Sequence, residues 1–327
     1  MVCTNSLTVI KNSRGEDGLM KRNKWFMAFL IAGLFLLGAC GKEEKPAADG
    51  KVKVTATTGM IGDIAANIGG DHIELVSLMK PGVDPHLYKA SQGDISKLEE
   101  ADIILYNGLN LEGKMEDIFE KMEENKPTVA VSKTVDETAL LDSADYPGQY
   151  DPHIWFDIDH WIKASEVVRD ELIKLDEEHA DDYEKNAAAY IEKLKELDEY
   201  ALEQIASIPE DQRVLVTAHD AFGYFGAKYG IEVRGLQGIS TESEVGSKDV
   251  SELRDYLVEN KIKAVFVESS VPKKTIEAVI EGAAQKGHTV KIGGELFSDA
   301  MGEEGTEEGT YIGMFRHNVD TVVNSLK

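Results

Sequence analysis

Two kinds of hydrophobic pattern alternate along most of the chain. Short apolar runs rich in β-branched residues predict strands, and apolar residues spaced three or four apart predict helices between them. The predicted strands are 52–57, 73–78, 103–106, 128–131, 214–217, 264–267 and 289–292. The predicted helices are 61–68, 91–99, 112–123, 247–260 and 272–286. Strands that alternate with helices are typical of α/β folds with parallel sheets.

The predicted strands fall into two groups, which indicates two Rossmann-like lobes with mostly parallel sheets. The first group ends before residue 135 and the second begins after residue 210. We therefore assign an N-terminal α/β lobe to 52–178 and a C-terminal α/β lobe to 209–327. A chain of 327 residues is also long enough for about two domains.

One long amphipathic stretch, 179–208, separates the lobes and predicts a backbone helix that joins them. Its apolar stripe repeats every three or four residues, at Tyr183, Ala187, Tyr190, Leu194, Leu197, Ala201 and Ile205. A helix of this size extends about 40 Å, which is enough to connect two lobes as a rigid strut. Pairing with a coiled-coil partner is the weaker alternative, because no heptad seam is sustained.

The N-terminal segment has the pattern of an export signal. A basic stretch at 21–24 precedes an uncharged apolar run at 25–39, which is too short to span a membrane as a helix. The run ends Leu-Gly-Ala-Cys, which resembles a bacterial lipobox with Cys40 as the lipidated residue. The alternative is an ordinary signal peptide followed by a chance cysteine. We expect 1–39 to be the signal peptide with an upstream extension before Met20, and 40–51 to be a flexible tether.

Composition narrows the classes of function. The chain has 60 acidic and 35 basic residues, a net charge of −25, which excludes nucleic acid as a partner. An acidic surface suits cations, although plain solubility is the commoner reason for one. Cys40 is the last cysteine in the sequence, so a site in either lobe has no thiolate ligands and the lobes have no disulfide.

A repeated tripeptide in the first lobe carries candidate metal ligands. Asp-Pro-His occurs at 84–86 and again at 151–153. Proline fixes its own φ and restricts the residue before it, so His86 and His153 stand on stiffened backbone, which suits metal ligation. A single histidine in such a loop is easily an ordinary hydrogen-bonded residue. Two in the same context favour a shared metal site.

The second lobe supplies two further candidates just beyond predicted strands. His219 follows the strand 214–217, at the carboxyl end where open α/β sheets bind ligands. Asp299 follows the strand 289–292 and two glycines, which permit a sharp turn. An N-cap or turn role for Asp299 is equally compatible with its spacing.

Four motifs resemble one known family. They are PHLY at 85–88, DPHIW at 151–155, TAHDAFGYF at 217–225 and LFSDAMG at 296–302. Together with the lipobox they are similar to the TroA-like metal-binding lipoproteins of bacterial ABC importers, from about residue 52 to the C-terminus, and most of all to the manganese-binding subgroup.

The resemblance implies both a site and a cellular setting. It implies an ion held between the lobes by His86, His153, His219 and Asp299. It also implies a monomer, anchored by an acylated Cys40 (palmitate included) on the extracytoplasmic face of the cell membrane. The partners it implies are an importer permease and its ATPase, with the ion as transported cargo.

The metal is Mn²⁺ in our prediction, with Zn²⁺ as the alternative. Many manganese members of the family place Glu where this chain has His219, which favours zinc. Zinc members often carry a His-rich loop before the second ligand, and no His lies between His86 and His153, which favours manganese. Three imidazoles and a carboxylate suit tetrahedral zinc, whereas a bidentate Asp299 favours manganese.

Neighbouring residues and other functions complete the prediction. Asp220 is predicted to orient a ligand histidine, and Glu268 to lie at the cleft after its strand. His160 is a distant reserve ligand, and His72, His179, His288 and His317 are expected in surface or packing roles. A secreted zinc hydrolase would need an open coordination position, and the chain has no HExxH. An adhesin would account for the export signal but not for the four candidate metal ligands. We therefore predict a receptor and not an enzyme.

Overall fold

The computed structural model describes residues 50–143 and 146–327. The predicted signal peptide, Cys40 and most of the tether lie outside the described residues. Among the residues that are described, no helix combines the length and the apolar character needed to cross a membrane.

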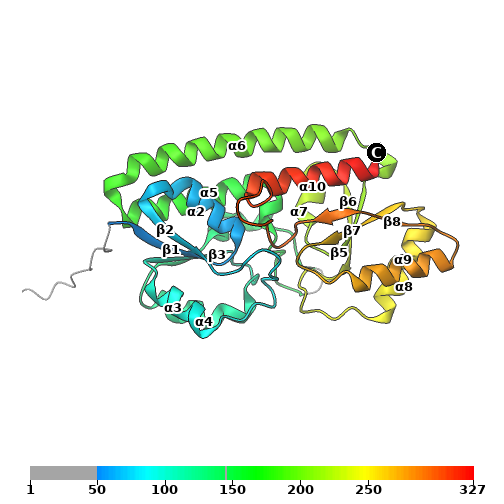
Figure 1. Cartoon of the computed structure of the whole chain (residues 1–327), viewed down its shortest axis with the longest axis horizontal. Helices are drawn as coiled ribbons and strands as arrows, with labels where there is room; N and C mark the ends of the chain where they lie inside the picture. Colours follow the sequence, from blue (N-terminus) through cyan, green and yellow to red (C-terminus); the bar gives the residue numbers. More distant parts are fainter. Residues whose placement is uncertain (1–49, 144–145) are drawn as a thin grey trace, which may run out of the picture. The chain divides into compact units, whose positions relative to one another are not determined.

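The first lobe is built on a parallel four-stranded sheet (Figure 1). Its strand order is β2-β1-β3-β4, and Val54 pairs with Ile103 where the two central strands meet. The strands are β1 (Val52–Ala56), β2 (Ile73–Ser77), β3 (Ile103–Tyr106) and β4 (Thr128–Ala130). The helices between them are α2 (Gly59–Gly69), α3 (Gln92–Glu100) and α4 (Glu116–Glu123). All of these elements match the predicted order.

The second lobe contains two parallel strand pairs, β5–β6 and β7–β8, with β5 beside β7. The strands are β5 (Val214–His219), β6 (Glu232–Gln237), β7 (Ala264–Glu268) and β8 (Lys291–Leu296). The helices are α7 (Gly223–Tyr229), α8 (Ser247–Glu259), α9 (Lys274–Gln285) and α10 (Tyr311–Leu326).

Two strands of this lobe differ from the prediction. Strand β6 was not predicted, because its sequence EVRGLQ lacks an apolar run and only Leu236 in it is fully buried. The last strand lies at 291–296 and not at 289–292, and it contains Gly293 and Gly294, which the sequence analysis treated as a turn. Pairing with β7 keeps these glycines extended, because Phe266 pairs with Gly294.

Two long helices precede the second lobe. Helix α5 (Ile158–Leu175) was not predicted, because its buried face includes the polar residues His160, Ser165 and Glu171, which obscure the apolar stripe. Helix α6 (Ala180–Ala206) is the predicted backbone helix. Its buried residues are the seven of the predicted stripe, Tyr183, Ala187, Tyr190, Leu194, Leu197, Ala201 and Ile205, so the apolar periodicity is confirmed.

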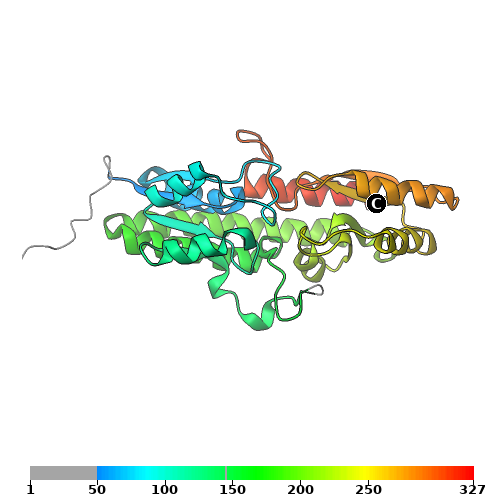
Figure 2. The ribbon, with the colours of Figure 1, turned by 90° about the horizontal axis from the view of Figure 1, so that it is seen from below.

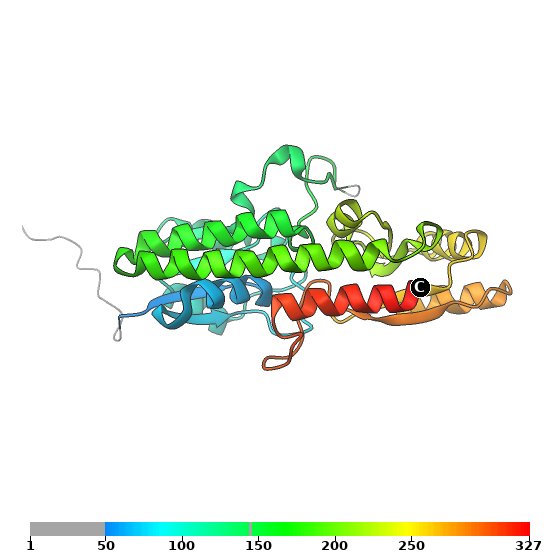
Figure 3. The same ribbon diagram turned by 90° about the horizontal axis from the view of Figure 1, so that it is seen from above.

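Helix α6 packs against both lobes. It contacts α2 and α5 of the first lobe and α7 and α10 of the second. Helices α2 and α10 lie end to end alongside it, as Figures 2 and 3 show. The predicted fold class, two α/β lobes joined by one long helix, is therefore confirmed.

The main hydrophobic core continues through both lobes. One cluster of buried side chains includes Val54 of β1, Tyr190 of α6, Phe222 beside α7 and Phe315 of α10. Smaller clusters lie under α3 and α4 in the first lobe and under α8 and α9 in the second. The loops between the lobes thus lie next to a hydrophobic core that both lobes share.

Candidate metal centre

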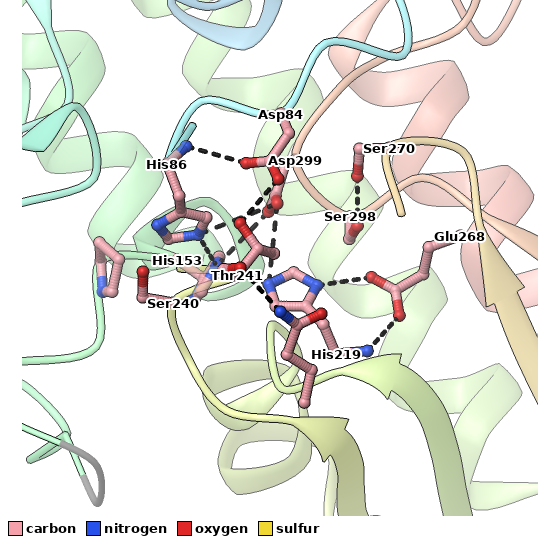
Figure 4. Close-up of polar contacts among 12 residues, drawn as sticks. Asp84, His86, His153, His219, Ser240, Thr241, Glu268, Ser270, Ser298 and Asp299 are labelled. Carbon is pink, nitrogen blue, oxygen red and sulfur yellow. Dashed lines mark hydrogen bonds and ion pairs between the residues drawn. The ribbon is translucent and has the colours of Figure 1, made fainter. Parts of the chain in front are cut away.

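The four predicted ligands converge between the lobes. His86 lies in the loop after β2, and His153 immediately precedes a short 3₁₀ turn before α5. His219 is the last residue of β5, and Asp299 follows β8. One possible ligand atom from each lies within 4.8 Å of the other three, and every side chain is buried (Figure 4).

His153 lies at the middle of the cluster. Its Nε2 is 3.3 Å from the Nε2 atoms of both His86 and His219. The Asp299 Oδ1 is 3.4 Å from the same nitrogen, and Oδ2 is 3.9 Å from His86 Nε2 and 3.7 Å from His219 Nε2. Three imidazole nitrogens and a carboxylate therefore surround one point.

The Asp299 carboxylate is the least satisfied group of the cluster. Both of its oxygens are buried and neither has a hydrogen-bond partner. Buried acceptors without donors are rare, and a buried charge needs a counter-charge. An ion between Asp299 and the imidazoles would supply that charge. The donors are nitrogen and oxygen only, which suits borderline and hard divalent metals.

Two of the imidazoles have a carboxylate on the ring nitrogen that faces away from the cluster. Asp151 Oδ1 lies 2.6 Å from His153 Nδ1 and accepts the His153 backbone N–H at 2.9 Å. Glu268 Oε2 lies 2.7 Å from His219 Nδ1, and its Oε1 accepts the His219 backbone N–H at 2.8 Å. A carboxylate in this position fixes the ring and its tautomer, leaving Nε2 for a metal.

Glu268 was predicted at the site from the sequence, but Asp151 was not. The available signal was the first residue of the Asp-Pro-His tripeptide. The matching residue before His86 behaves differently, because Asp84 accepts the His86 backbone N–H at 2.9 Å and the Thr241 hydroxyl at 2.6 Å. The same tripeptide therefore supports one imidazole through its ring and the other only through its backbone.

The remaining candidates lie outside the four-residue cluster. The backbone N–H of Asp220 donates to the Gln237 carbonyl at 3.0 Å, and the predicted role of its side chain stays a prediction. His160 packs edge-on against Tyr224. His288 and His317 contact backbone carbonyls, and His72 stacks on His179 at 3.9 Å between ring centroids.

The environment shifts the pKa values of the imidazoles in opposite directions. Burial lowers the pKa of His86 to about 3, with Asp299 opposing it only in part. Burial also disfavours a charged His153, but Asp151 and Asp299 outweigh it and raise the pKa to about 10. For His219, burial is likewise outweighed by Asp299 and Glu268, and its pKa is raised.

Asp299 stays ionised in this setting. Burial acts to raise its pKa, but the three imidazoles, His219 first, reverse that effect and hold the pKa far below its usual range. In the ion-free protein, protons on the imidazoles balance this carboxylate. A metal ion that enters the cluster therefore displaces protons.

Groups of the second lobe hold the loop that carries His153. The Trp155 indole N–H donates to the Ser298 carbonyl at 2.9 Å, next to Asp299. The Tyr311 hydroxyl donates to the Trp155 carbonyl at 2.6 Å, and the Tyr224 hydroxyl to the Asp151 carbonyl at 2.8 Å. The two lobes are thus joined directly beside the cluster.

Two α/β lobes on a shared long helix, with a buried cluster of three histidines and an aspartate between them, define a two-lobed binding protein with an ion-sized site. The chain belongs to the family described as zinc-uptake complex component A, periplasmic, whose model matches residues 54–325.

Relatives extend this comparison over most of the chain. The manganese-binding lipoprotein MntA of Bacillus subtilis is 54% identical over 302 residues, which cover 92% of this chain and 98% of that protein. The zinc-binding protein TroA of Treponema pallidum is 48% identical over 280 residues, 86% of this chain and 90% of that protein. The structure of the periplasmic zinc-binding protein TroA superposes with a TM-score of 0.83 and 47% identity, covering 85% of this chain and 99% of that one.

Proposed function

We propose that this protein captures Mn²⁺ outside the cytoplasm and delivers it to the permease of an ABC importer, which an ATPase drives. The observation that carries the proposal is the buried cluster of His86, His153, His219 and Asp299, in which both oxygens of the aspartate have no hydrogen-bond partner. Family membership and the names of the two relatives support the same role.

Capture follows from the charges of the site. An incoming divalent ion meets an ionised Asp299 and replaces the proton that His153 holds. Asp151 and Glu268 keep two imidazoles oriented, with Nε2 of each turned to the cluster. Little reorganisation is then needed when the ion binds, because the rings are already fixed.

Manganese is favoured over zinc by the position of Asp299. Its Oδ1 approaches His153 while Oδ2 approaches His86 and His219, so both oxygens face the point where an ion would lie. A bidentate carboxylate with three imidazoles gives five donors, whereas structural zinc prefers four. Zinc remains the second candidate, because one relative is named a zinc-binding protein and imidazoles suit that ion.

Location and assembly are part of the proposal. Relatives of this chain are named lipoproteins, and Cys40 stands where a lipid would be attached. We propose an acylated Cys40, an anchor on the extracytoplasmic face and a monomeric protein that turns nothing over. Replacing Cys40 with Ala is expected to release a protein that still binds metal, and retention on membranes after a high-salt wash would argue against the anchor.

The test of the proposed function is metal-dependent stability. Mn²⁺ at 100 times its dissociation constant is expected to stabilise the folded protein by about 2.7 kcal/mol, because the unfolded chain lacks the assembled site. His219→Ala should lose most of the resulting rise in melting temperature. His317→Ala should keep it, because His317 contacts the Glu295 carbonyl and lies outside the cluster.

An equal response in those two variants would remove His219 from the site. The identity of the ion is tested by metal analysis of protein isolated after growth with both metals present. Predominant zinc would overturn the manganese assignment and keep the receptor role.

A further inference from the structure

A buried carboxylate outside the metal cluster ties together two loops of the first lobe. Glu112 is 2% exposed. Its Oε1 accepts the Thr57 hydroxyl at 2.6 Å and the Asn107 backbone N–H at 2.8 Å, and its Oε2 accepts the Gly108 N–H at 3.4 Å. Thr57 and Asn107 directly follow β1 and β3, so Glu112 joins the exits of the two central strands.

The backbone that Glu112 holds is strained. Gly108, Leu109 and Asn110 have φ values of 83°, 54° and 64° in succession. Left-handed conformation is unfavourable for Leu109 and, less so, for Asn110, so such a run persists only where its surroundings enforce it. Glu112 enforces it here by accepting the N–H groups at its start. Strain of this kind commonly accompanies function.

Asn107 extends the network to the metal cluster. Its side-chain amide, 1% exposed, donates from Nδ2 to the carbonyl of Pro152 at 2.9 Å. Pro152 is the residue before His153. The carbonyls on either side are also occupied, because Asp151 accepts the Tyr224 hydroxyl and His153 accepts the Phe156 N–H. Three consecutive carbonyls therefore accept hydrogen bonds, and that of Pro152 accepts two, one from Asn107 Nδ2 and one from the Ile154 N–H at 2.8 Å.

We propose that Glu112 and Asn107 are positioning residues for the ion site. Glu112 holds Asn107, Asn107 holds the Pro152 carbonyl, and that contact sets the position of His153, whose Nε2 lies 3.3 Å from both other imidazole nitrogens. This inference rests on the proposed function. It assigns part of the affinity to a network that touches none of the four ligand side chains.

Calorimetric titration of the whole protein with Mn²⁺, together with the EPR spectrum of bound Mn²⁺, tests the proposal. Asn107→Ala and Glu112→Gln are each expected to weaken binding about tenfold to 100-fold, as loss of outer support to a metal ligand typically does. Both should alter the EPR spectrum. The double variant should be little weaker than either single one, because the two residues act through one route.

Glu171→Gln is the matched control. Glu171 is also a buried carboxylate of the first lobe, 8% exposed, but it pairs with Lys133 and Lys174 and has no described contact with the ligand loops. This variant is expected to lose thermal stability while its Mn²⁺ affinity and EPR spectrum stay as in the wild type. A merely structural role for Glu112 would make the two glutamine variants alike.

Folded Asn107→Ala with unchanged affinity and spectrum would overturn the proposal, and so would additive losses in the double variant. If Glu112→Gln does not fold, Thr57→Val removes one donor from the same carboxylate, and unchanged affinity there has the same meaning. His153→Ala distinguishes a failure of the proposed function from a failure of this inference. If it binds Mn²⁺ as the wild type does, the proposed function fails; if it loses binding while Asn107→Ala keeps it, only this inference fails.

Discussion

Two of the three histidines in the candidate site are held through their rings, and the third is held through its backbone. His153 and His219 each have a carboxylate within 2.7 Å of the ring Nδ1, and their pKa values are raised. His86 has its described carboxylate contact at the backbone N–H, through Asp84, and burial lowers its pKa to about 3. Two of the candidate ligands are therefore oriented bases that carry protons in the ion-free protein, and the third is a neutral donor.

This difference shows that equal ligand types need not contribute equally. A carboxylate behind an imidazole increases its basicity and restricts its rotation, so the cost of organising the ligand falls on folding and not on binding. His86 lacks that ring support among its described contacts, and its loop is held from the second lobe by the Thr241 hydroxyl on Asp84.

Removal of an imidazole is expected to have the largest effect. His153→Ala and His219→Ala should lose most of the Mn²⁺-induced rise in melting temperature, because each leaves a buried carboxylate without its partner as well as removing a donor. His86→Ala should keep a measurable fraction of it. Scanning calorimetry with and without Mn²⁺ provides the measurement, and equal residual responses in all three variants would contradict the comparison.

The second largest effect is expected when a carboxylate that supports an imidazole is removed. Asp151→Asn and Glu268→Gln are expected to weaken Mn²⁺ binding about tenfold to 100-fold, because the amide no longer fixes a basic imidazole. Asp84→Asn should change the dissociation constant less, because its carboxylate contacts the His86 backbone and the Thr241 hydroxyl but not the His86 ring. Titration of the three variants under one buffer condition ranks them. A loss in Asp84→Asn as large as in Asp151→Asn would erase the distinction.

The pH dependence provides a third, smaller effect. In the ion-free protein the pKa of His153 is about 10, so a proton is bound at pH 7 and Mn²⁺ must displace it. Binding should release about one proton or more, and affinity should rise about tenfold per pH unit for each. Titrations in buffers with different ionisation enthalpies measure that number, and the absence of proton release would contradict the raised pKa.

The raised pKa of His153 affects the stability of the ion-free protein in the opposite direction: its contribution to stability falls as pH rises. A histidine whose pKa is raised on folding stabilises the protein fully below its unfolded value of 6.5, and the contribution is lost as pH rises through about 10. The melting temperature of the ion-free protein should include a contribution that declines between those values. Asp151→Asn should reduce that decline, because Asp151 is a main cause of the shift.

The smallest effect is expected at the surface pair between the lobes. Lys114 and Glu242 form an ion pair at 2.8 Å, with side chains 38% and 35% exposed. Solvent screening limits such pairs to about 0–1 kcal/mol. Lys114→Ala should therefore leave Mn²⁺ affinity within about threefold of wild type, and it should change unfolding free energy by less than about 1 kcal/mol. A larger loss of unfolding free energy in chemical denaturation would show that solvent does not screen this pair as its exposure implies.

The sequence pattern predicted those parts of the fold whose signals are local. The stripe of α6 from Tyr183 to Ile205 repeats at helical spacing, and each of its apolar residues is buried. Strand β6 and helix α5 were missed because tertiary contacts determine them. Arg234 and Gly235 belong to β6 only because β5 lies beside them, and the buried polar residues of α5 weaken its periodicity.

The residues of the candidate site likewise divide into those with a local signal in the sequence and those determined by tertiary contacts. His86, His153, His219 and Asp299 were accessible from motifs that repeat a known pattern, and the structure brings them together. Asp151 was not selected, although it stands two positions before His153 in the repeated tripeptide. Asn107 was not selected because its partner is adjacent only after folding. The Asn107 amide reaches Pro152, which lies 45 positions further along the chain. No spacing pattern in the sequence predicts such a contact.

The hydrophobic cluster that runs through both lobes has a consequence for how the protein loses its structure. Because Val54, Tyr190, Phe222 and Phe315 belong to one packed core, neither lobe can melt without exposing apolar surface of the other. We therefore expect the two lobes to unfold together, despite their separate sheets. An ion bound between the lobes is then expected to protect strands far from the cluster from protease attack wherever cleavage requires the shared core to open.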